Sequence, residues 1–585
     1  MKGRDMDRTE LDPIQIEVIR NALVAACEQM SITIWRTSRS TVVREMLDYS
    51  TALFDAKGRN IAQATRLPVH LNSMATCLED ILDRFIPIGD WRDGDVVLTN
   101  DPYSGGQHLP DILTFRPVCL DGKPIAIVGV LCHHIDVGGG APGSYDPEAT
   151  EIYQEGLRIP PVKLFDGGVR NDPLYKVMLT NSREPGKLSG DLASQFAALD
   201  VGAAEVTRIA RHYGTATLTG VTERILDQSE QAMRAALAAM PDGEYVFEDY
   251  VDDDGITEAP LKIKVTLTIA GDQAKVDFTG SSPQAAGCVN CTLNMSKSAV
   301  YFALMSGVAA GVVQPPSSED RRVTTHAPEG DFSANSGCYR PIEIAAPLGT
   351  VVNCRAPAPV VNRMATGHRI VNAVTGALAQ AAPGRIPAAY YGVSYVYALG
   401  TPREDGSTDV YFEVEVGGWG AHPEADGASG FSAGFHNLAN SPVEMVESLH
   451  PVTFTSYGLT PDSGGAGRTR GGLGLHREWR VDAEQGTLAT SFERFRIPPY
   501  GLAGGKPAAC GRLLVRRSGQ VQQMPSKVSG VALKKGDVVR LETSGGGGYG
   551  DPATRPRDAV ARDLRDGYVS EKAAREVYGA NTAND

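Results

Sequence analysis

The hydrophobic periodicity of this chain changes in blocks, and this pattern constrains the fold more than any other feature of the sequence. Residues 12–38 carry apolar side chains at helical spacing, with Asp12 placed to cap a helix and Pro13 suited to its first turn. Residues 40–140 instead favour short β-branched strands bounded by Gly, Pro or Asp. Because helices and strands do not alternate regularly, the pattern predicts an α+β fold rather than a doubly wound parallel sheet.

Individual elements follow from the same periodicity. We expect strands at Ser50–Phe54, Val96–Thr99, Ile112–Val118 and Ile125–Val137, and helices at Asn72–Phe85, Asp191–Tyr213 and Val221–Met240. The stretch 138–190 has little periodicity and is predicted to be mostly loop.

The periodicity changes from helical to strand-like at Asp242-Gly243-Glu244, which we take as a domain boundary. The chain is therefore expected to contain several domains. We expect residues 1–243 to form an N-terminal α+β region with the candidate metal site. Residues 244–310 are expected to form a β-meander followed by a helix, and residues 311–585 a β-rich region with Gly-rich loops that ends in two short helices.

Composition excludes several classes of function. The net charge of −14 argues against a nucleic-acid partner, and no apolar run is long enough to span a membrane. The N-terminus has no apolar stretch typical of a secretory signal. Nine scattered cysteines do not form a disulfide framework and favour a cytoplasmic location. Glycine and proline are abundant, with 64 and 36 residues, so loops are expected to carry the sites.

Histidine and aspartate gather between residues 100 and 137. Three of the eleven histidines, His108, His133 and His134, fall in this segment, at the ends of predicted strands. His108 and Asp111 are three residues apart on a Gly-rich loop that can turn both side chains inward. His133 and His134 are adjacent on a strand, so they face opposite sides and one of them at most points to a given site. Imidazole and carboxylate bind Zn²⁺, Mn²⁺ or Fe²⁺, but solvated histidines at a strand end would give the same pattern.

Two acids stand upstream of this cluster. Asp55-Ala56-Lys57-Gly58 is explained as a tight turn, so Asp55 is interpreted as structural. Asp48 begins an apolar strand, where a carboxylate is costly unless it is paired or bound to a metal.

Three further motifs have weaker claims to function. The loop Asp462–Gly472 combines glycines with two arginines and could bind an anion, although a tight structural loop is the preferred interpretation. Gly545-x-Gly547-x-x-Gly550 matches a dinucleotide fingerprint, but too little chain follows to complete a parallel strand. Cys288 and Cys291 form one CxxC without a second pair, which argues against zinc. The chain thus has no nucleotide-binding motif of its own.

Several of these segments together resemble the hydantoinase B/oxoprolinase family, and they occur in chain order from about residue 10 to 575. The segments are Asp48–Ser50 with Leu53–Asp55, Asn100–Asp111, His133–Gly139, Glu155–Pro161, Asp462–Gly472, Gly545–Asp551 and Arg565–Ser570. The resemblance implies a B-type subunit of an ATP-dependent cyclic amide hydrolase acting on hydantoins, lactams or oxoproline. It further implies a hetero-oligomer in which a partner A subunit binds ATP and phosphorylates the substrate.

The resemblance also implies a set of site residues. Asp48, His108, Asp111 and His133 are expected to bind one divalent metal (Zn, Mn or Fe), which would activate water to attack the phosphorylated amide. Asp136 or His134 could orient a ligand, and Glu155 could contact the substrate or transfer a proton.

Two alternatives remain open. The chain could be a subunit of an ATP-dependent ketone carboxylase of the acetone or acetophenone type, although the length favours the hydrolase branch. It could also be a non-catalytic scaffold for an ATPase partner, which would bind no metal.

Overall fold

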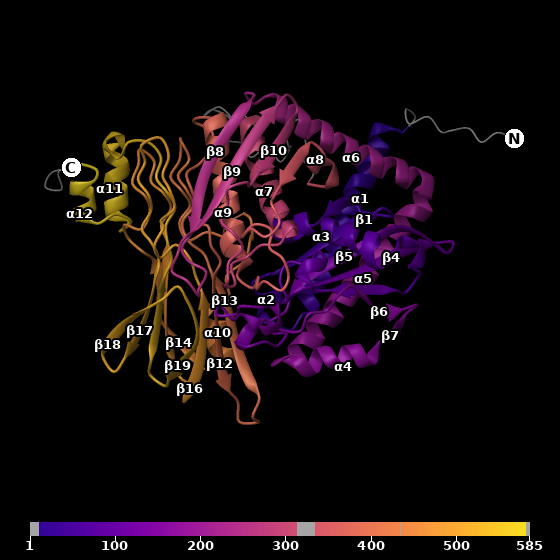
Figure 1. The fold of residues 1–585 in the computed structure, drawn as a ribbon, viewed down its shortest axis with the longest axis horizontal. Coiled ribbons are helices and arrows are strands. Elements are labelled where there is room, and N and C mark those ends of the chain that lie inside the picture. Colours follow the sequence, from indigo (N-terminus) through magenta and orange to yellow (C-terminus); the bar gives the residue numbers. More distant parts are fainter. Residues whose placement is uncertain (1–10, 313–333, 433, 581–585) are drawn as a thin grey trace.

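The computed structural model describes residues 11–312, 334–432 and 434–580, and Figure 1 shows their arrangement. Helices and four β-sheets follow one another in blocks, which confirms the predicted α+β class. The N-terminal elements lie on one side of the molecule and the long C-terminal strands, in orange and yellow, on the other. Within the described residues, no helix is long and apolar enough to cross a membrane.

A seven-stranded antiparallel sheet forms the centre of the N-terminal half. Its strands lie in the order β2 (Asn60–Gln63), β1 (Tyr49–Asp55), β5 (Lys123–His133), β4 (Asp111–Leu120), β3 (Val96–Thr99), β6 (Val162–Asp166) and β7 (Val169–Arg170). The surrounding helices are α1 (Pro13–Thr37), α2 (Thr41–Arg44), α3 (Pro68–Asp80), α4 (Asp172–Asn181), α5 (Pro185–Tyr213) and α6 (Thr215–Ala238).

Strand alternation divides the apolar side chains of this sheet between two cores. Leu53 and Val130 pack on the face covered by α1, α5 and α6, whereas Phe54 and Leu131 pack against α3 on the opposite face. Each face thus buries every second side chain of a strand, as a sheet with helices on both sides requires.

A four-stranded sheet and its helices follow in the chain. The sheet has the order β11 (Ile342–Ala345), β10 (Gln273–Asp277), β9 (Leu261–Ala270), β8 (Gly243–Val251), and the helices are α7 (Leu293–Val312), α8 (Ser336–Tyr339) and α9 (Arg363–Ala381). Helix α9 packs against β8 and β9. Its first turn reaches back towards the seven-stranded sheet, because the Arg363 side chain contacts Asp111.

Two antiparallel sheets make up most of the remaining chain. One has the order β13 (Thr408–Glu415), β12 (Tyr395–Pro402), β16 (Gln485–Ser491), β19 (Lys527–Lys534). The other has the order β14 (Val452–Leu459), β15 (Leu475–Val481), β20 (Val538–Glu542), β17 (Arg512–Arg517), β18 (Gln520–Met524). Their helices are α10 (Val443–Leu449), α11 (Arg557–Arg565) and α12 (Glu571–Glu576).

Most elements lie where the periodicity predicts them, and one stretch differs. The first helix begins at Pro13 with the Asp12 carboxylate accepting from the Ile14 N–H at 3.0 Å, as expected. The stretch 138–190 was expected to be mostly loop, yet it contains β6, β7, α4 and the start of α5. Strands β6 and β7 are short, and α4 has Pro173 in its first turn and few buried side chains. Too few of their residues are buried to give a periodic pattern of apolar side chains. The domain boundaries remain predictions.

The glycine-rich segments are joined by many backbone hydrogen bonds into a layer, which we call the glycine layer: residues 417–430, 463–472, 500–508 and 544–550. Gly546 donates its N–H to Gly472 O at 2.9 Å, and its own carbonyl accepts from Gly465 N at 2.8 Å. A Cβ at Gly546 would lie 1.9 Å from Trp419 O. The backbones therefore pack too closely at such glycines to admit a side chain, which supports the structural interpretation of the Asp462–Gly472 loop.

Candidate metal centre

Three strand ends bring the acidic and imidazole side chains together. Strand β4 begins at Asp111 and the antiparallel strand β5 ends at His133, and these two residues are direct cross-strand partners. Asp48 immediately precedes β1 on the other side of β5, and its carbonyl accepts from the His133 N–H at 3.0 Å. His108 joins them through a turn in which its carbonyl accepts from the Asp111 N–H at 3.0 Å.

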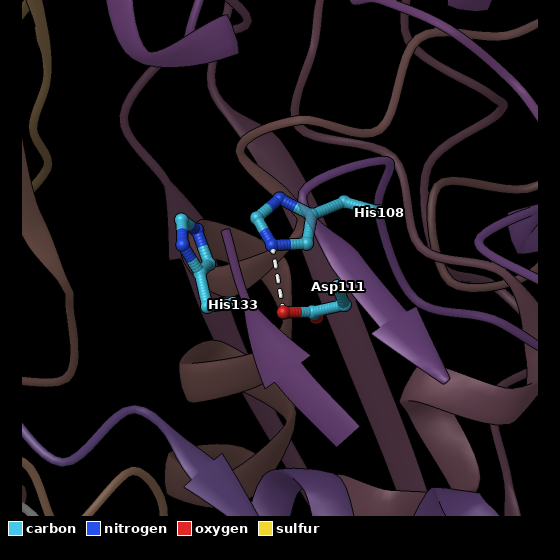
Figure 2. Close-up of side chains that lie close together, drawn as sticks. All are labelled: His108, Asp111 and His133. Carbon is cyan, nitrogen blue, oxygen red and sulfur yellow. Dashed lines mark ion pairs between the residues drawn. The ribbon is translucent and has the colours of Figure 1, made fainter. Parts of the chain in front are cut away.

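His108, Asp111 and His133 form a compact buried cluster (Figure 2). Each offers a ligand atom, and these atoms lie within 4.8 Å of one another. His108 Nε2 is 3.2 Å from Asp111 Oδ1, and the centroids of the two imidazole rings are 4.9 Å apart. The ends of β4 and β5 and the turn before β4 thus bring these three side chains to one place.

His70 is a further member of this site that the sequence analysis did not identify. It lies in the first turn of α3, and its Nε2 is 3.5 Å from Asp48 Oδ1 and 3.8 Å from Asp111 Oδ1. The sequence contains no motif around His70, since helix α3 was expected to begin at Asn72, two residues later. Its proximity to Asp48 and Asp111 comes from the packing of α3 on the sheet.

The polar atoms of the site lack protein partners, which tests whether a metal fits. Within the described parts of the chain, both ring nitrogens of His108, Nδ1 of His133 and one carboxylate oxygen each of Asp48 and Asp111 are buried without a hydrogen bond. Buried polar groups are nearly always satisfied, so a cluster of orphaned atoms indicates a missing ligand. Nitrogen and carboxylate donors at this spacing fit a divalent transition metal.

Electrostatics favour the same ligand. Burial lowers the pKa of His108 and of His133 well below the usual value, and it lowers that of His70 to about 3, so these imidazoles are neutral and keep a free lone pair. Burial, followed by the charge of Asp111, raises the pKa of Asp48 well above its usual range. A cation bound beside Asp48 would favour its ionised form.

Arg363 supports the cluster from helix α9, and sequence analysis did not single it out. Its Nη2 donates to Asp111 Oδ2 at 2.7 Å and to Gln107 Oε1 at 3.2 Å. The Gln107 amide in turn donates to Val69 O at 2.5 Å and to Ser73 Oγ at 2.8 Å. This chain of bonds holds Asp111 in one orientation, with its other oxygen turned to His108.

A cavity of about 40 Å³ lies beside the cluster. Its polar lining consists of Asp48, His70, His108, His133, Arg363, Ser394 and His436. The remaining lining is apolar or aromatic: Leu67, Val69, Tyr145, Met364, Val396, Phe412, Val414 and Leu438. Polar groups that converge on an otherwise apolar wall are typical of a binding site, and they lie here beside the proposed metal ligands.

His134, Asp136 and Glu155 lie outside both the metal-ligand cluster and the cavity lining. His134 faces the opposite side from His133, as expected for neighbours on a strand, and its Nε2 lies 2.9 Å from Gln195 Oε1. Asp136 accepts from the N–H groups of Gly138, Gly143 and Arg183 and pairs with the Arg183 side chain, so it organises a loop. Their roles as orienting groups remain predictions.

Glu155 is also removed from the cavity lining, but it is connected to the site. One of its carboxylate oxygens accepts from the Val360 and Val361 N–H groups at 2.7 and 2.8 Å, and these residues directly precede α9. Burial raises the pKa of Glu155 to about 8. Glu155 thus contacts the turn that leads to Arg363, and a direct role towards substrate stays a prediction.

Cys288 and Cys291 are both buried and unbonded to other cysteines. Burial raises the pKa of both thiols, and the Cys291 thiol donates to Arg363 O at 3.3 Å. Among the described residues, the grouping suited to a metal is the one around His108. These cysteines therefore have packing roles in this structure.

The chain is similar to known proteins over nearly its whole length. The model of a family described as hydantoinase B/oxoprolinase matches residues 12–552. The β subunit of caprolactamase from Pseudomonas jessenii is 34% identical, over 97% of this chain and 96% of that protein. A 5-oxoprolinase from Dictyostelium discoideum is 28% identical over 93% of this chain, which corresponds to 40% of that longer protein.

Solved structures show the same architecture. The crystal structure of the ATP-dependent caprolactamase from Pseudomonas jessenii matches with a TM-score of 0.89 and 32% identity, covering 98% of this chain and 96% of the other. A nucleotide-free acetone carboxylase matches with a TM-score of 0.87 over 97% of this chain and 80% of the other. The latter is only 20% identical, so it shows a shared fold alone.

Proposed function

Since this chain belongs to the hydantoinase B/oxoprolinase family, we propose that it is the metal-dependent hydrolytic subunit of an ATP-dependent cyclic amide hydrolase. It opens the ring of a lactam, hydantoin or oxoproline-type substrate after an A-type partner subunit has phosphorylated the substrate with ATP. The observation that carries the proposal is the buried set of orphaned ligand atoms on His108, Asp111, His133 and Asp48 at the edge of a cavity.

The donor set defines what each residue does. His108, Asp111 and His133 would hold a divalent metal. We propose Asp48, whose Oδ1 is 3.5 Å from His70 Nε2, as an additional ligand. Such a metal, when bound, supplies Lewis acidity and lowers the pKa of water to about 7. Arg363 and Gln107 keep Asp111 oriented, and the apolar walls formed by residues such as Phe412 and Val414 exclude bulk water from the reacting amide.

The need for a partner follows from the chemistry. An unstrained cyclic amide is a poor electrophile, and phosphorylation of its carbonyl oxygen creates a good leaving group. The sequence has no phosphate-binding loop of the P-loop type, and the loop that resembles a dinucleotide fingerprint is packed into the glycine layer. ATP binding therefore falls to the A-type subunit, and the active species is a hetero-oligomer of both subunits.

The test combines metal analysis with a coupled assay. We expect about one Zn, Mn or Fe per purified chain, as a one-site donor set requires. Product should appear only when the A-type subunit, ATP and a cyclic amide are all present. Asp111→Asn should lose the metal and product formation, because it weakens a ligand and its pairing with Arg363.

His134→Gln is the matched control, since His134 is the neighbouring buried histidine on the opposite face. This variant should keep its metal. Full activity of a metal-free preparation would contradict the proposal and leave the scaffold hypothesis. Bicarbonate-dependent carboxylation of a ketone, without amide hydrolysis, would assign the chain to the carboxylase branch instead.

A further inference from the structure

Arg363 has more hydrogen-bonding capacity than its known partners use. It is only 3% exposed and lines the cavity, and its Nη2 bonds to Asp111 and Gln107. Its Nε–H is buried, and no acceptor for it lies within the described ranges of the chain. A buried guanidinium with an unused donor at a cavity wall is a costly arrangement unless a ligand completes it.

The backbone around Arg363 adds to this arrangement. Arg363 is the first residue of the 19-residue helix α9, whose amino end carries the positive part of the helix dipole. Asn362, at the N-cap, is fully buried, and neither polar atom of its side chain has a partner in the part of the chain that is described. Glu155 fixes the preceding turn through Val360 and Val361.

The charge balance of the site indicates the sign of the missing ligand. Asp48 and Asp111 can together carry two negative charges, which a divalent metal would balance. The positive charge of Arg363 would then remain, at a cavity where uncompensated charge is expensive. The charge that completes this site is therefore negative.

We propose that the amino end of α9, with Arg363 as the contacting side chain and Asn362 beside it, binds the phosphoryl group of the activated substrate. The proposal rests on the proposed function, because that function supplies the phosphorylated amide. The planar guanidinium donates its free Nε–H to a phosphoryl oxygen, a geometry that arginine favours. The phosphoryl group is thereby held next to the metal ligands, and the amide carbon is directed towards them.

The probe is inorganic phosphate, titrated calorimetrically into the metal-loaded chain without the partner subunit. Arg363→Met removes the charge and should weaken phosphate binding by about tenfold or more, the usual loss for a charge-assisted hydrogen bond. Asn362→Asp keeps Arg363 and the ligands but adds a negative charge at the amino end of α9, and it should also weaken binding. Asn171→Asp, at the N-cap of the distant helix α4, is the matched control and should bind phosphate like the wild type.

Metal content and melting temperature are measured for every variant. If Arg363→Met is misfolded or loses its metal, Asn362→Asp decides the question. If Asn362→Asp is folded and metal-loaded and still binds phosphate like the wild type, the proposed site is wrong. The same result for a folded, metal-loaded Arg363→Met would also overturn the proposal. Phosphate binding is measured without turnover, so it remains informative even if no cyclic amide is hydrolysed.

The coupled assay separates the two sources of phosphate. If Arg363→Met also raises KM for product formation or uncouples ATP consumption from product, the site holds the phosphorylated substrate. If phosphate binding is lost while product formed per ATP consumed is unchanged, the site holds only released phosphate, and the proposal is overturned.

Discussion

The metal-ligand cluster and the glycine layer both stood out in the sequence, and the structure gives them opposite characters. Around His108 and Asp111, buried side-chain atoms lack partners and a cavity adjoins them. In the glycine layer, the backbone groups of Gly465, Gly472 and Gly546 bond to one another and leave no room for side chains. A motif therefore indicates a ligand-binding function when its buried polar groups lack hydrogen-bond partners. It indicates a structural role when its polar groups bond to one another.

Gly546→Ala is expected to have the largest effect on stability, because it disrupts the glycine layer. The added Cβ would lie 1.9 Å from Trp419 O, which is backbone and cannot move aside. We expect the free energy of unfolding to fall by more than about 4 kcal/mol, or folding to fail. Chemical denaturation measures this. Gly186→Ala is the control, because no atom lies within 4 Å of a Cβ there, and its effect should stay within about 1 kcal/mol.

His108→Ala tests the opposite region, where function should be lost and the fold kept. The side chain is buried but lines an existing cavity, so its removal enlarges that cavity instead of creating a new one. The metal affinity and the rate of product formation should each fall by more than about 100-fold. Residues that only orient a metal ligand cause losses of about 10- to 100-fold. ATP consumption by the A-type partner can persist without product.

Leu109→Ala is the matched partner of that experiment. Leu109 is fully buried in an apolar core next to His108, so its truncation should cost about 2–5 kcal/mol of stability while the metal is retained. If instead His108→Ala keeps both metal and product, the site lies elsewhere and His134 with Asp136 is the next set to test.

Glu155→Gln should have the smallest effect. Glu155 combines features of the metal-ligand cluster and the glycine layer, because one of its carboxylate oxygens is hydrogen-bonded and the other has no partner among the described residues. Because burial raises its pKa to about 8, the folded state prefers the protonated acid. The stabilisation is complete below the unfolded-state pKa of about 4.3 and is lost as the pH rises through about 8.

Glutamine stays neutral throughout this range. The melting temperature of Glu155→Gln relative to the wild type should therefore rise by a few degrees between about pH 5 and about pH 9. A substitution of the exposed Glu484 by glutamine should not reproduce this trend. A difference that is constant with pH would show that Glu155 does not titrate in the folded protein.

Much of this protein is determined by its sequence. The spacing of apolar residues and the cap at Asp12 predict α1, and β-branched runs predict β1, β3, β4 and β5 within a few residues. The separation of His133 from His134 follows from strand alternation. The Asp48, His108, Asp111 and His133 set comes from family resemblance. The structure places ligand atoms of His108, Asp111 and His133 within 4.8 Å of one another, and Asp48 lies outside that group, with its Oδ1 3.5 Å from His70 Nε2.

Only the tertiary structure decided the remainder of the site. His70 lies in the first turn of α3 and Arg363 is the first residue of α9, and neither helix carries a ligand motif. His70 reaches Asp111 because α3 packs on the seven-stranded sheet, and Arg363 reaches it because the first turn of α9 approaches the start of β4. Sequence periodicity records which face of a helix is buried but not what the end of that helix meets. Whether a buried polar atom is satisfied depends on contacts between residues hundreds of positions apart, and those contacts exist only in the folded chain.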